Sequence, residues 1–228
     1  EPNLTSWKNF LGKLKNPLHE VKIGLIGKYN ELPDAYKSIY EAFIHAGAVN
    51  ECKVRVIPIH AEELEGSYKD VSKALSSLNG ILVAPGFGER GIEGKLTAIR
   101  YARENNVPFF GICLGMQTAC VEFARNVLQL AGAASTEVDP KTPYPIIDMM
   151  EGQKGVTQKG GTMRLGAYAC DIKKKTHAYE AYRSLLIQER HRHRWEFNNQ
   201  YLEQFEKAGM TATGINPESK LVEIIELR

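Results

Sequence analysis

The chain has 228 residues, enough for one large α/β domain that buries a full core without disulfides or metals. Charged side chains make up 25% of the residues but leave a net charge of only +2, which excludes a global field directed at nucleic acid or a membrane. The four cysteines form neither a disulfide framework nor a CxxC metal site, and no apolar run could span a bilayer. We therefore expect a cytoplasmic protein that contacts neither nucleic acid nor a membrane.

The first half of the chain alternates between strand and helix patterns. Residues 1–20 predict an amphipathic leading helix or linker that packs on a domain spanning residues 21–228. Apolar runs at 21–27, 52–59 and 80–84 predict strands, separated by helical patterns at 35–46 and 71–78. Asp34 is expected to cap the first of these helices, and Gly47 to end it. The alternation predicts a doubly wound, mostly parallel sheet flanked by helices, which binds ligands at the carboxyl ends of its strands.

The stretch around Cys113 organises this prediction. A buried strand at 107–112 runs into Gly111-Ile-Cys113-Leu-Gly115, and a helical pattern then continues to Leu130. Small residues two positions either side of an apex let a strand turn sharply into a helix and expose the central side chain, as in a nucleophile elbow. A thiol at a helix N-terminus is favoured as thiolate. The alternative is that Cys113 is a small buried hydrophobe, as most free cysteines are.

A glycine-rich loop at residues 85–94 follows the strand at 80–84. Four glycines in ten residues are compatible with simple turn chemistry, or with a loop whose backbone N–H groups bind an anion or an oxyanion. The loop lacks the Gly-Lys-Ser/Thr ending of a nucleotide P-loop. Pro85 has no N–H, so a donor from this loop must come from Gly86 or beyond, beside the N–H of Leu114. A helix is expected from Lys95 to Asn105.

The second half of the chain is less regular. Residues 131–162 predict a long irregular connection, which is usually functional or mobile. A strand at 163–172, an exposed lysine turn at 173–175, a short helix at 179–186, a helix at 201–208 and strands at 210–215 and 220–227 follow. In the basic run 188–197, His191 and His193 would share one face of a strand. Spacing alone assigns none of the six histidines as a general base.

Five motifs together resemble the glutaminase domain of CTP synthase, which belongs to the class I (triad) glutamine amidotransferases. They are Gly111-Ile-Cys-Leu-Gly-Met-Gln117, the loop Gly86-Phe-Gly-Glu-Arg-Gly-Ile-Glu-Gly-Lys95, Gly160-Gly-Thr-Met-Arg-Leu-Gly166, Glu189-Arg-His-Arg-His-Arg-Trp-Glu-Phe-Asn198 and Leu221-Val-Glu-Ile-Ile-Glu226. The resemblance runs from about residue 20 to the end. The elbow indicates only the superfamily, whereas the third and fourth motifs are specific to CTP synthase.

The resemblance implies that Cys113 attacks the side-chain amide of L-glutamine, giving a glutamyl thioester and ammonia. It implies an oxyanion held by the N–H groups of Leu114 and Gly86. The residues implied to contact glutamine are Gly86, Leu114, Gly115, Met116, Gln117, Glu137 and Arg194. A carboxylate suits the α-ammonium of glutamine, and a guanidinium suits its α-carboxylate. For His191 and His193 the resemblance favours a structural or domain-contact role.

The resemblance also implies parts outside these 228 residues. Ammonia would pass to a synthetase domain of the same polypeptide, which binds UTP and Mg-ATP, while GTP activates the coupling; this domain itself would need no cofactor or metal. The full-length enzyme would be a homo-oligomer, with residues 1–20 as the linker between domains. The general-base histidine and its orienting glutamate lie in a Phe-His-Pro-Glu motif, which we expect beyond Arg228. Two alternatives stay open: a catalytically silent binding or assembly module, and a Cys-elbow hydrolase or redox chaperone of related fold.

Overall fold

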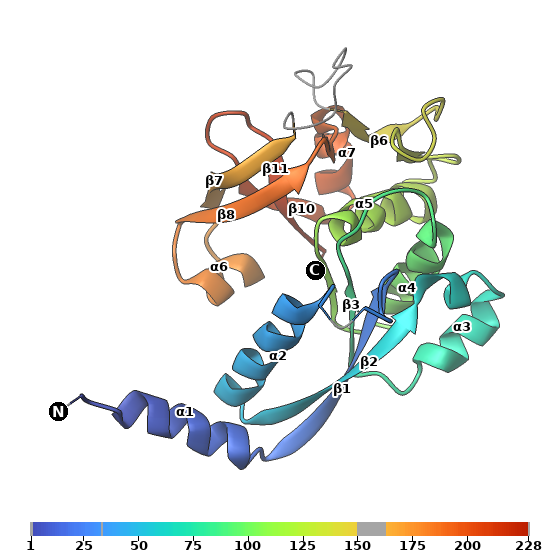
Figure 1. Cartoon of the computed structure of the whole chain (residues 1–228). Helices are drawn as coiled ribbons and strands as arrows, with labels where there is room; N and C mark the ends of the chain where they lie inside the picture. The colour runs from blue at the N-terminus through green and yellow to red at the C-terminus, as the bar shows by residue number, and fades with distance from the viewer. Residues whose placement is uncertain (1, 33, 150–162, 228) are drawn as a thin grey trace. The chain divides into compact units, whose positions relative to one another are not determined.

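The computed structural model describes residues 2–32, 34–149 and 163–227, in two compact units, residues 1–118 and 119–228 (Figure 1). No helix among the described residues is long and apolar enough to cross a membrane.

The first unit is built on a four-stranded parallel sheet in the order β2-β1-β3-β4. Its strands are β1 (His19–Gly27), β2 (Cys52–His60), β3 (Gly80–Val83) and β4 (Phe109–Gly111). The apolar runs of the sequence therefore form the expected parallel sheet, although β1 begins two residues before the predicted start of the domain. The chain leaves β1 toward β2 and returns past β1 to β3, so the strand order reverses beside β1, where doubly wound sheets bind their ligands.

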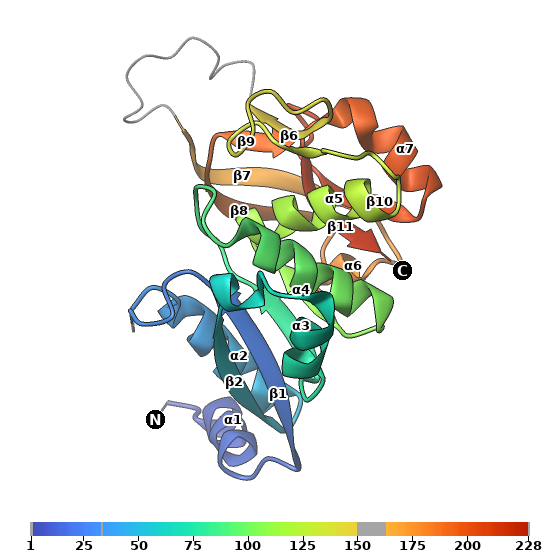
Figure 2. The same ribbon diagram turned by 90° about the vertical axis from the view of Figure 1, so that its right-hand side faces the viewer.

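Helices cover both faces of this sheet. Right-handed crossovers place α2 (Lys37–Val49) on one face and α3 (Tyr68–Leu75) and α4 (Ile92–Glu104) on the other, as Figure 2 shows. The short 3₁₀ helix η1 (Ala61–Leu64) packs against α4. The sheet and helices enclose a core of apolar side chains, among them Leu25, Leu82 and Val83.

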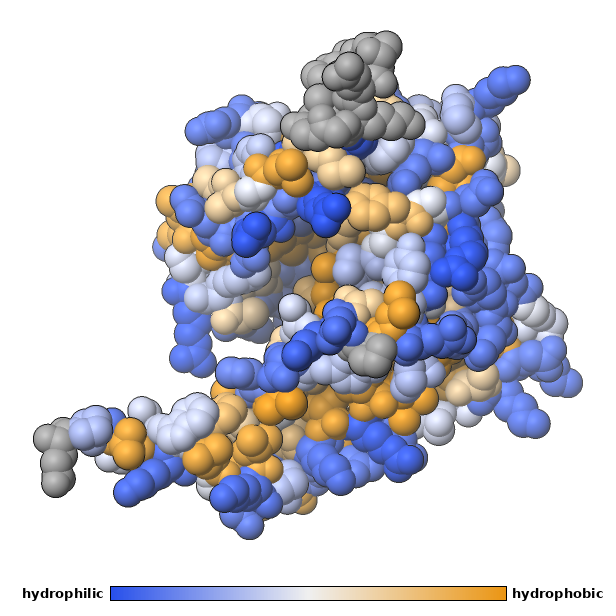
Figure 3. All heavy atoms as spheres, viewed as in Figure 1, coloured by the Kyte–Doolittle hydropathy of each residue, from blue (hydrophilic) through white to orange (hydrophobic). Residues whose placement is uncertain are grey.

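The leading helix α1 (Thr5–Lys15) contains no buried residue. It contacts α2, where the ring of Phe10 lies 5.5 Å from that of His45. Several large apolar side chains on and beside it face outward, including Trp7 at 56% exposure and Leu18 at 77%. Figure 3 shows apolar side chains gathered along this helix.

Three predicted helices in this unit have different boundaries in the structure. Asp34 does not cap α2, whose first residue follows Tyr36, and Gly47 does not end the helix, which continues to Val49. A Cβ at Gly47 would lie 2.6 Å from the carbonyl oxygen of Cys52, so glycine is there for close packing. The helix predicted at 71–78 is α3, which begins earlier because the Ser67 side chain accepts a hydrogen bond from the N–H of Asp70. The helix predicted from Lys95 already begins at Ile92.

The elbow helix α5 (Leu114–Asn126) begins in the first unit and continues into the second. It ends four residues before the predicted Leu130, and the chain turns at Gln129, which adopts a positive φ of 58°. The second unit contains an antiparallel sheet in the order β11-β10-β7-β8 and a three-stranded sheet in the order β5-β6-β9.

The antiparallel sheet consists of β7 (Arg164–Ile172), β8 (Leu186–His193), β10 (Met210–Ile215) and β11 (Val222–Leu227). The strands predicted at 163–172, 210–215 and 220–227 are thus present with small differences in their ends. The small sheet consists of β5 (Ala134–Ser135), β6 (Pro145–Met149) and β9 (Trp195–Phe197). Two of its strands lie in the stretch expected to be irregular, and the remainder of that stretch, 150–162, lies outside the described residues.

Short helices connect the strands of the second unit. They are α6 (His177–Tyr182), η3 (Asn199–Tyr201) and α7 (Leu202–Lys207). The helix predicted at 179–186 begins and ends earlier, because the Thr176 side chain caps it by accepting from the N–H of Tyr179 and the chain already enters β8 at Leu186.

Candidate functional site

Cys113 lies at the apex of a sharp turn between β4 and α5. Its φ of 53° is left-handed, a conformation that costs a non-glycine residue energy and is concentrated at functional sites. The carbonyl of Cys113 accepts the N–H of Gln117 at 3.0 Å, so the cysteine directly precedes the first helical turn. The N–H of Ile112 donates to the carbonyl of Val83 at 3.1 Å, which ties the turn to β3. The predicted nucleophile elbow geometry is therefore present, with a half-buried thiol at its apex.

The two glycines of the elbow are required by space. A Cβ at Gly111 would lie 2.5 Å from the backbone carbon of Gly115, and a Cβ at Gly115 would lie 2.2 Å from the carbonyl oxygen of Val83. Both values are far below the distances at which carbon atoms pack. The first glycine lets α5 start directly over β4, and the second lets it approach β3.

The glycine-rich loop lies beside the start of α5. A Cβ on Gly86 would contact only the side chain of Leu114, at 3.6 Å, so the two residues predicted to donate to an oxyanion are neighbours. The side chain of Lys28, which directly follows β1 and is 5% exposed, holds the loop in place. Its ammonium donates to the carbonyls of Phe87 at 2.8 Å and Gly88 at 2.7 Å.

Two further contacts hold Lys28 and its loop. The guanidinium of Arg90 donates to the Lys28 carbonyl at 3.0 Å and pairs with the carboxylate of Glu62 on η1 at 3.2 Å. The hydroxyl of Tyr36 accepts the Lys28 N–H at 3.0 Å. A loop with this many anchors presents its backbone groups in one arrangement, which an oxyanion site needs.

Lys95, in the first turn of α4, is completely buried. Burial, with Lys28 as the next contribution, lowers its pKa to about 8, against the opposing effects of Cys113 and Glu62. Neither Lys28 nor Lys95 is a site candidate in the sequence, which predicts Lys95 only as the start of a helix. Nothing in their local pattern distinguishes a buried lysine from a solvated one.

The second unit contains the other two predicted site residues, Glu137 and Arg194. Glu137 is the second residue after β5, and its N–H donates to the side chain of Ser135 at 3.2 Å. Arg194 is 6% exposed and lies between β8 and β9. Strand β5 is parallel to β6, and Met149 near the end of β6 pairs with Trp195 at the start of β9. The register therefore places Glu137 and Arg194 at the same end of the small sheet, next to its two outer strands.

A buried network of charged side chains includes His193 and Glu196, which lie on either side of Arg194 in the sequence. Arg164 donates to Glu223 at 2.6 Å and to Glu196 at 3.2 Å. His191 and His193 lie 2.7 Å apart through their ring nitrogens, with His191 3.4 Å from Glu223 and His193 3.3 Å from Glu196. The two histidines lie on the same face of β8, as their spacing predicted, and both side chains contact the carboxyl groups of this network.

Burial sets the protonation of the network. It raises the pKa of Glu196 to about 8 and lowers that of His193, with help from His191 and Arg164, to about 4. Burial also lowers the pKa of His191. At neutral pH the network therefore pairs the Arg164 cation with Glu223, while Glu196 keeps its proton and the imidazoles are neutral. These contacts support a structural role for both histidines.

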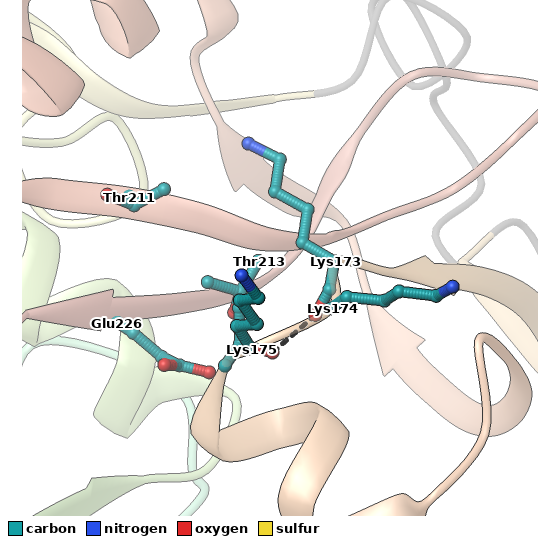
Figure 4. Close-up of a pocket in the computed structure, with 7 residues that line it drawn as sticks. Lys173, Lys174, Lys175, Thr211, Thr213 and Glu226 are labelled. Atoms are coloured by element: carbon teal, nitrogen blue, oxygen red, sulfur yellow. Dashed lines mark hydrogen bonds between the residues drawn. The ribbon is translucent and has the colours of Figure 1, made fainter.

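A separate hollow of about 240 Å³ lies elsewhere in the second unit, at the lysine turn after β7 (Figure 4). The lysines of this turn are exposed, as expected. Glu226 accepts the N–H groups of His177 and Ala178 at 3.0 and 2.9 Å, and Thr176 donates to the Lys173 carbonyl at 2.6 Å. None of the predicted site residues lines this hollow.

The predicted site residues thus form two groups. The first unit brings together Cys113, Gly86 and the turn Leu114, Gly115, Met116 and Gln117, and the second places Glu137 and Arg194 at the same end of its small sheet. Among the described residues, no three His, Cys, Asp or Glu side chains are arranged to hold a metal ion.

Comparison with known proteins gives a consistent picture. The glutamine amidotransferase class-I family matches residues 31–228. The chain is 65% identical over 228 residues to a CTP synthase of Cytophaga hutchinsonii, covering all of this chain and 42% of the relative. It is 57% identical over 229 residues to a CTP synthase of Chlorobaculum tepidum, covering all of this chain and 40% of the relative. The chain therefore spans about 40% of the length of these curated relatives.

Among solved structures, the glutaminase domain of Trypanosoma brucei CTPS with bound acivicin matches with a TM-score of 0.83. The identity is 35%, and the match covers 91% of this chain and 82% of that chain.

Proposed function

The chain belongs to the class I glutamine amidotransferase family, and from this premise we propose that it is the glutaminase part of a CTP synthase. It would hydrolyse L-glutamine to glutamate and ammonia, and the ammonia would aminate UTP to CTP on a synthetase domain of the same polypeptide. The observation that carries the proposal is Cys113, a half-buried thiol with a φ of 53° between two glycines that admit no side chain. The CTP synthases that cover the whole chain support the choice of acceptor.

The reaction would proceed through a covalent intermediate. The Cys113 sulfur attacks the amide carbon of glutamine, forming a C–S bond and a tetrahedral oxyanion. The N–H groups of Leu114 and Gly86 stabilise this oxyanion, an assignment supported by the contact between their residues. The C–N bond then breaks and ammonia leaves with the proton that the thiol gave up. Water hydrolyses the thioester, which releases glutamate and restores the thiol.

Two residues of the second unit would hold the amino-acid end of glutamine. Glu137 would pair with the α-ammonium and Arg194 with the α-carboxylate. Their placement at one end of the small sheet supports a joint role. Arg194 is buried, so a carboxylate bound to it would be shielded from water, where such pairing is strongest. Met116 and Gln117, half-buried in the first turn of α5, would complete the contacts.

The remaining parts of the proposal concern the whole enzyme. Mg-ATP and UTP would bind the synthetase domain, GTP would activate the coupling, and the enzyme would be a cytoplasmic homo-oligomer. Helix α1 would serve as the connection to the synthetase domain. Its outward-facing apolar side chains, with Trp7 and Leu18 more than half exposed, support a contact with a further part of the polypeptide.

Covalent labelling tests the nucleophile. The protein is incubated with acivicin, which the Trypanosoma relative binds, and the modified residue is located by peptide mass. We expect one adduct on Cys113, none in C113S, and protection by L-glutamine. Absence of any adduct on Cys113 would favour a catalytically silent module. Cys52, also half-buried, is the matched control, and C52S should label as the wild type does.

Substrate binding tests the amidotransferase assignment against a Cys-elbow hydrolase. R194M and E137Q should each weaken L-glutamine binding by about tenfold or more, measured by calorimetry, since each removes one charge-assisted contact. The neighbouring exposed Arg192 gives a matched control, R192M, with unchanged affinity. Unchanged affinity in both R194M and E137Q would overturn the assignment of glutamine as substrate.

A further inference from the structure

Lys95 is a buried ammonium whose function the motifs do not explain. Its side chain is 0% exposed, and its Nζ has no hydrogen-bond partner among the described residues. Burying a charge without an acceptor is unfavourable, so lysines in such positions normally carry a partner. A buried lysine that remains without one, next to a reactive group, is a candidate for an electrostatic role.

The backbone leaves Lys95 little freedom of position. Helix α4 begins at Gly91, which has a φ of 71°, and a Cβ at Gly94 would lie only 1.8 Å from the carbonyl oxygen of Ala61. The first turn of α4 is therefore pressed directly onto η1. Lys95 is the next residue, at the edge of the sheet that also carries the elbow and the loop after β1.

Three ionisable groups affect the pKa of Lys95. Its electrostatic neighbours are Lys28, Glu62 and Cys113, and Glu62 is itself paired with Arg90. The Lys28 ammonium is bound to two loop carbonyls and the Glu62 carboxylate is shared with Arg90, so neither is a dedicated partner for Lys95.

The remaining acidic side chains of these segments, Glu63, Glu89 and Glu93, are exposed. The groups that affect the charge of Lys95 thus include a second cation, Lys28, and one carboxylate, Glu62, that is shared with Arg90. An anion on the sulfur of Cys113 would be a compensating charge for the buried ammonium.

We propose that Lys95 is a positioning residue for the thiolate of Cys113: its buried ammonium stabilises the anionic sulfur and increases the nucleophilic fraction of the thiol. The proposal rests on the nucleophile assigned under the proposed function. The effect requires no contact with glutamine, and the loss of water around Lys95 strengthens it, because charges interact more strongly where water is excluded.

Titration of Lys95 fits this role. With burial lowering its pKa to about 8, the side chain is still mostly protonated at pH 7 and loses its charge above pH 8. The lysine is thus mostly a cation at neutral pH, and it is partly deprotonated in mild alkali.

The rate of alkylation of Cys113 by iodoacetamide, followed by peptide mass from pH 5 to pH 10, tests the proposal. Thiolate is the reactive form, so the midpoint of the rate profile reports its formation. In K95M the midpoint should move to higher pH, with a rate at pH 7 lower by about tenfold, the change that one pKa unit produces. K73M, which removes an exposed lysine of α3, should leave the profile unchanged.

An unchanged midpoint in folded K95M would overturn the proposal, and K95Q replaces it if K95M does not fold. Iodoacetamide does not resemble glutamine, so the two proposals fail separately. A normal alkylation profile without acivicin labelling would contradict the glutaminase assignment, whereas acivicin labelling with an unshifted K95M profile would contradict only the role of Lys95.

Discussion

Replacement of Lys95 by methionine should stabilise the protein while it impairs Cys113. The lysine side chain is fully buried and its pKa falls from 10.5 to about 8, which at about 1.4 kcal/mol per pKa unit corresponds to about 3 kcal/mol. This penalty is present in full below pH 8, where the lysine is charged in both the folded and the unfolded state. Between pH 8 and 10.5 the unfolded state binds more protons, so the stability of the wild type rises with pH.

K95M has no such dependence, since methionine keeps most of the side-chain volume and carries no charge. Its free energy of unfolding should exceed that of the wild type by about 3 kcal/mol at pH 7, and this advantage should shrink as the pH approaches 10.5. Urea denaturation followed by circular dichroism at pH 7, 8.5 and 10 measures both quantities. K73M should stay within about 0.5 kcal/mol of the wild type at each pH, as surface substitutions do. The reasoning is refuted if K95M is less stable than the wild type at pH 7, or if the difference does not change with pH.

Three further predictions concern the elbow and the buried network. G115A should lose more than about 3 kcal/mol of stability or fail to label at Cys113, because its Cβ would lie 2.2 Å from the Val83 carbonyl oxygen; thermal melting and acivicin labelling measure this. R164A should lower the free energy of unfolding by about 3–5 kcal/mol, because it removes the guanidinium partner of the buried Glu223 carboxylate and of Glu196, whereas R192A on the exposed face of β8 should not. Burial raises the pKa of Glu196 to about 8, so wild-type stability should fall from pH 4.5 toward pH 8 as the unfolded carboxyl ionises first, and E196Q should flatten that fall in urea titrations at successive pH values.

The parts of the fold that follow from local pattern were predictable from the sequence. Continuous apolar runs bounded by glycine and polar residues located β1 and β3 within about two residues. The spacing of Gly111, Cys113 and Gly115 predicted the elbow, because a strand that turns into a helix without room for side chains admits only glycine on both sides. The structure adds the left-handed φ of Cys113, which the spacing did not predict.

The errors arose where contacts distant in sequence override local signals. Glycine is a common helix terminator, so Gly47 predicts the end of a helix. In the structure the helix continues to Val49, and glycine is required at position 47 because the chain packs closely on Cys52. Strands β5 and β6 are short, with two and five residues. Strand β6 is stabilised by pairing with β9, which lies some fifty residues later in the chain. No local pattern contains that partner.

The charged residues illustrate the same limit in the candidate site. Arg194 and the two histidines occupy one conspicuous basic run, yet the structure separates them: Arg194 is buried at one end of the small sheet, and His191 and His193 join Arg164 and its carboxyl partners. Lys28 and Lys95 attract no notice in the sequence but are among the most deeply buried charges of the first unit. Burial of a charge depends on the tertiary fold, so sequence pattern identifies the nucleophile and not its electrostatic surroundings.

The two buried charge systems differ in a way that bears on function. In the second unit, Arg164 bonds to the carboxyl groups of Glu196 and Glu223, and each of these groups also contacts an imidazole, so the charges are largely compensated within the network. In the first unit, Lys95 has no hydrogen-bond acceptor among the described residues, and a second cation, Lys28, acts with burial to disfavour its charged form. A compensated network can be retained for the structure it fixes, whereas an uncompensated cation lowers stability and needs another reason to persist. The thiolate of Cys113 supplies such a reason. The buried Lys95 ammonium has no anionic partner while Cys113 is a thiol, and it gains one when the thiolate forms.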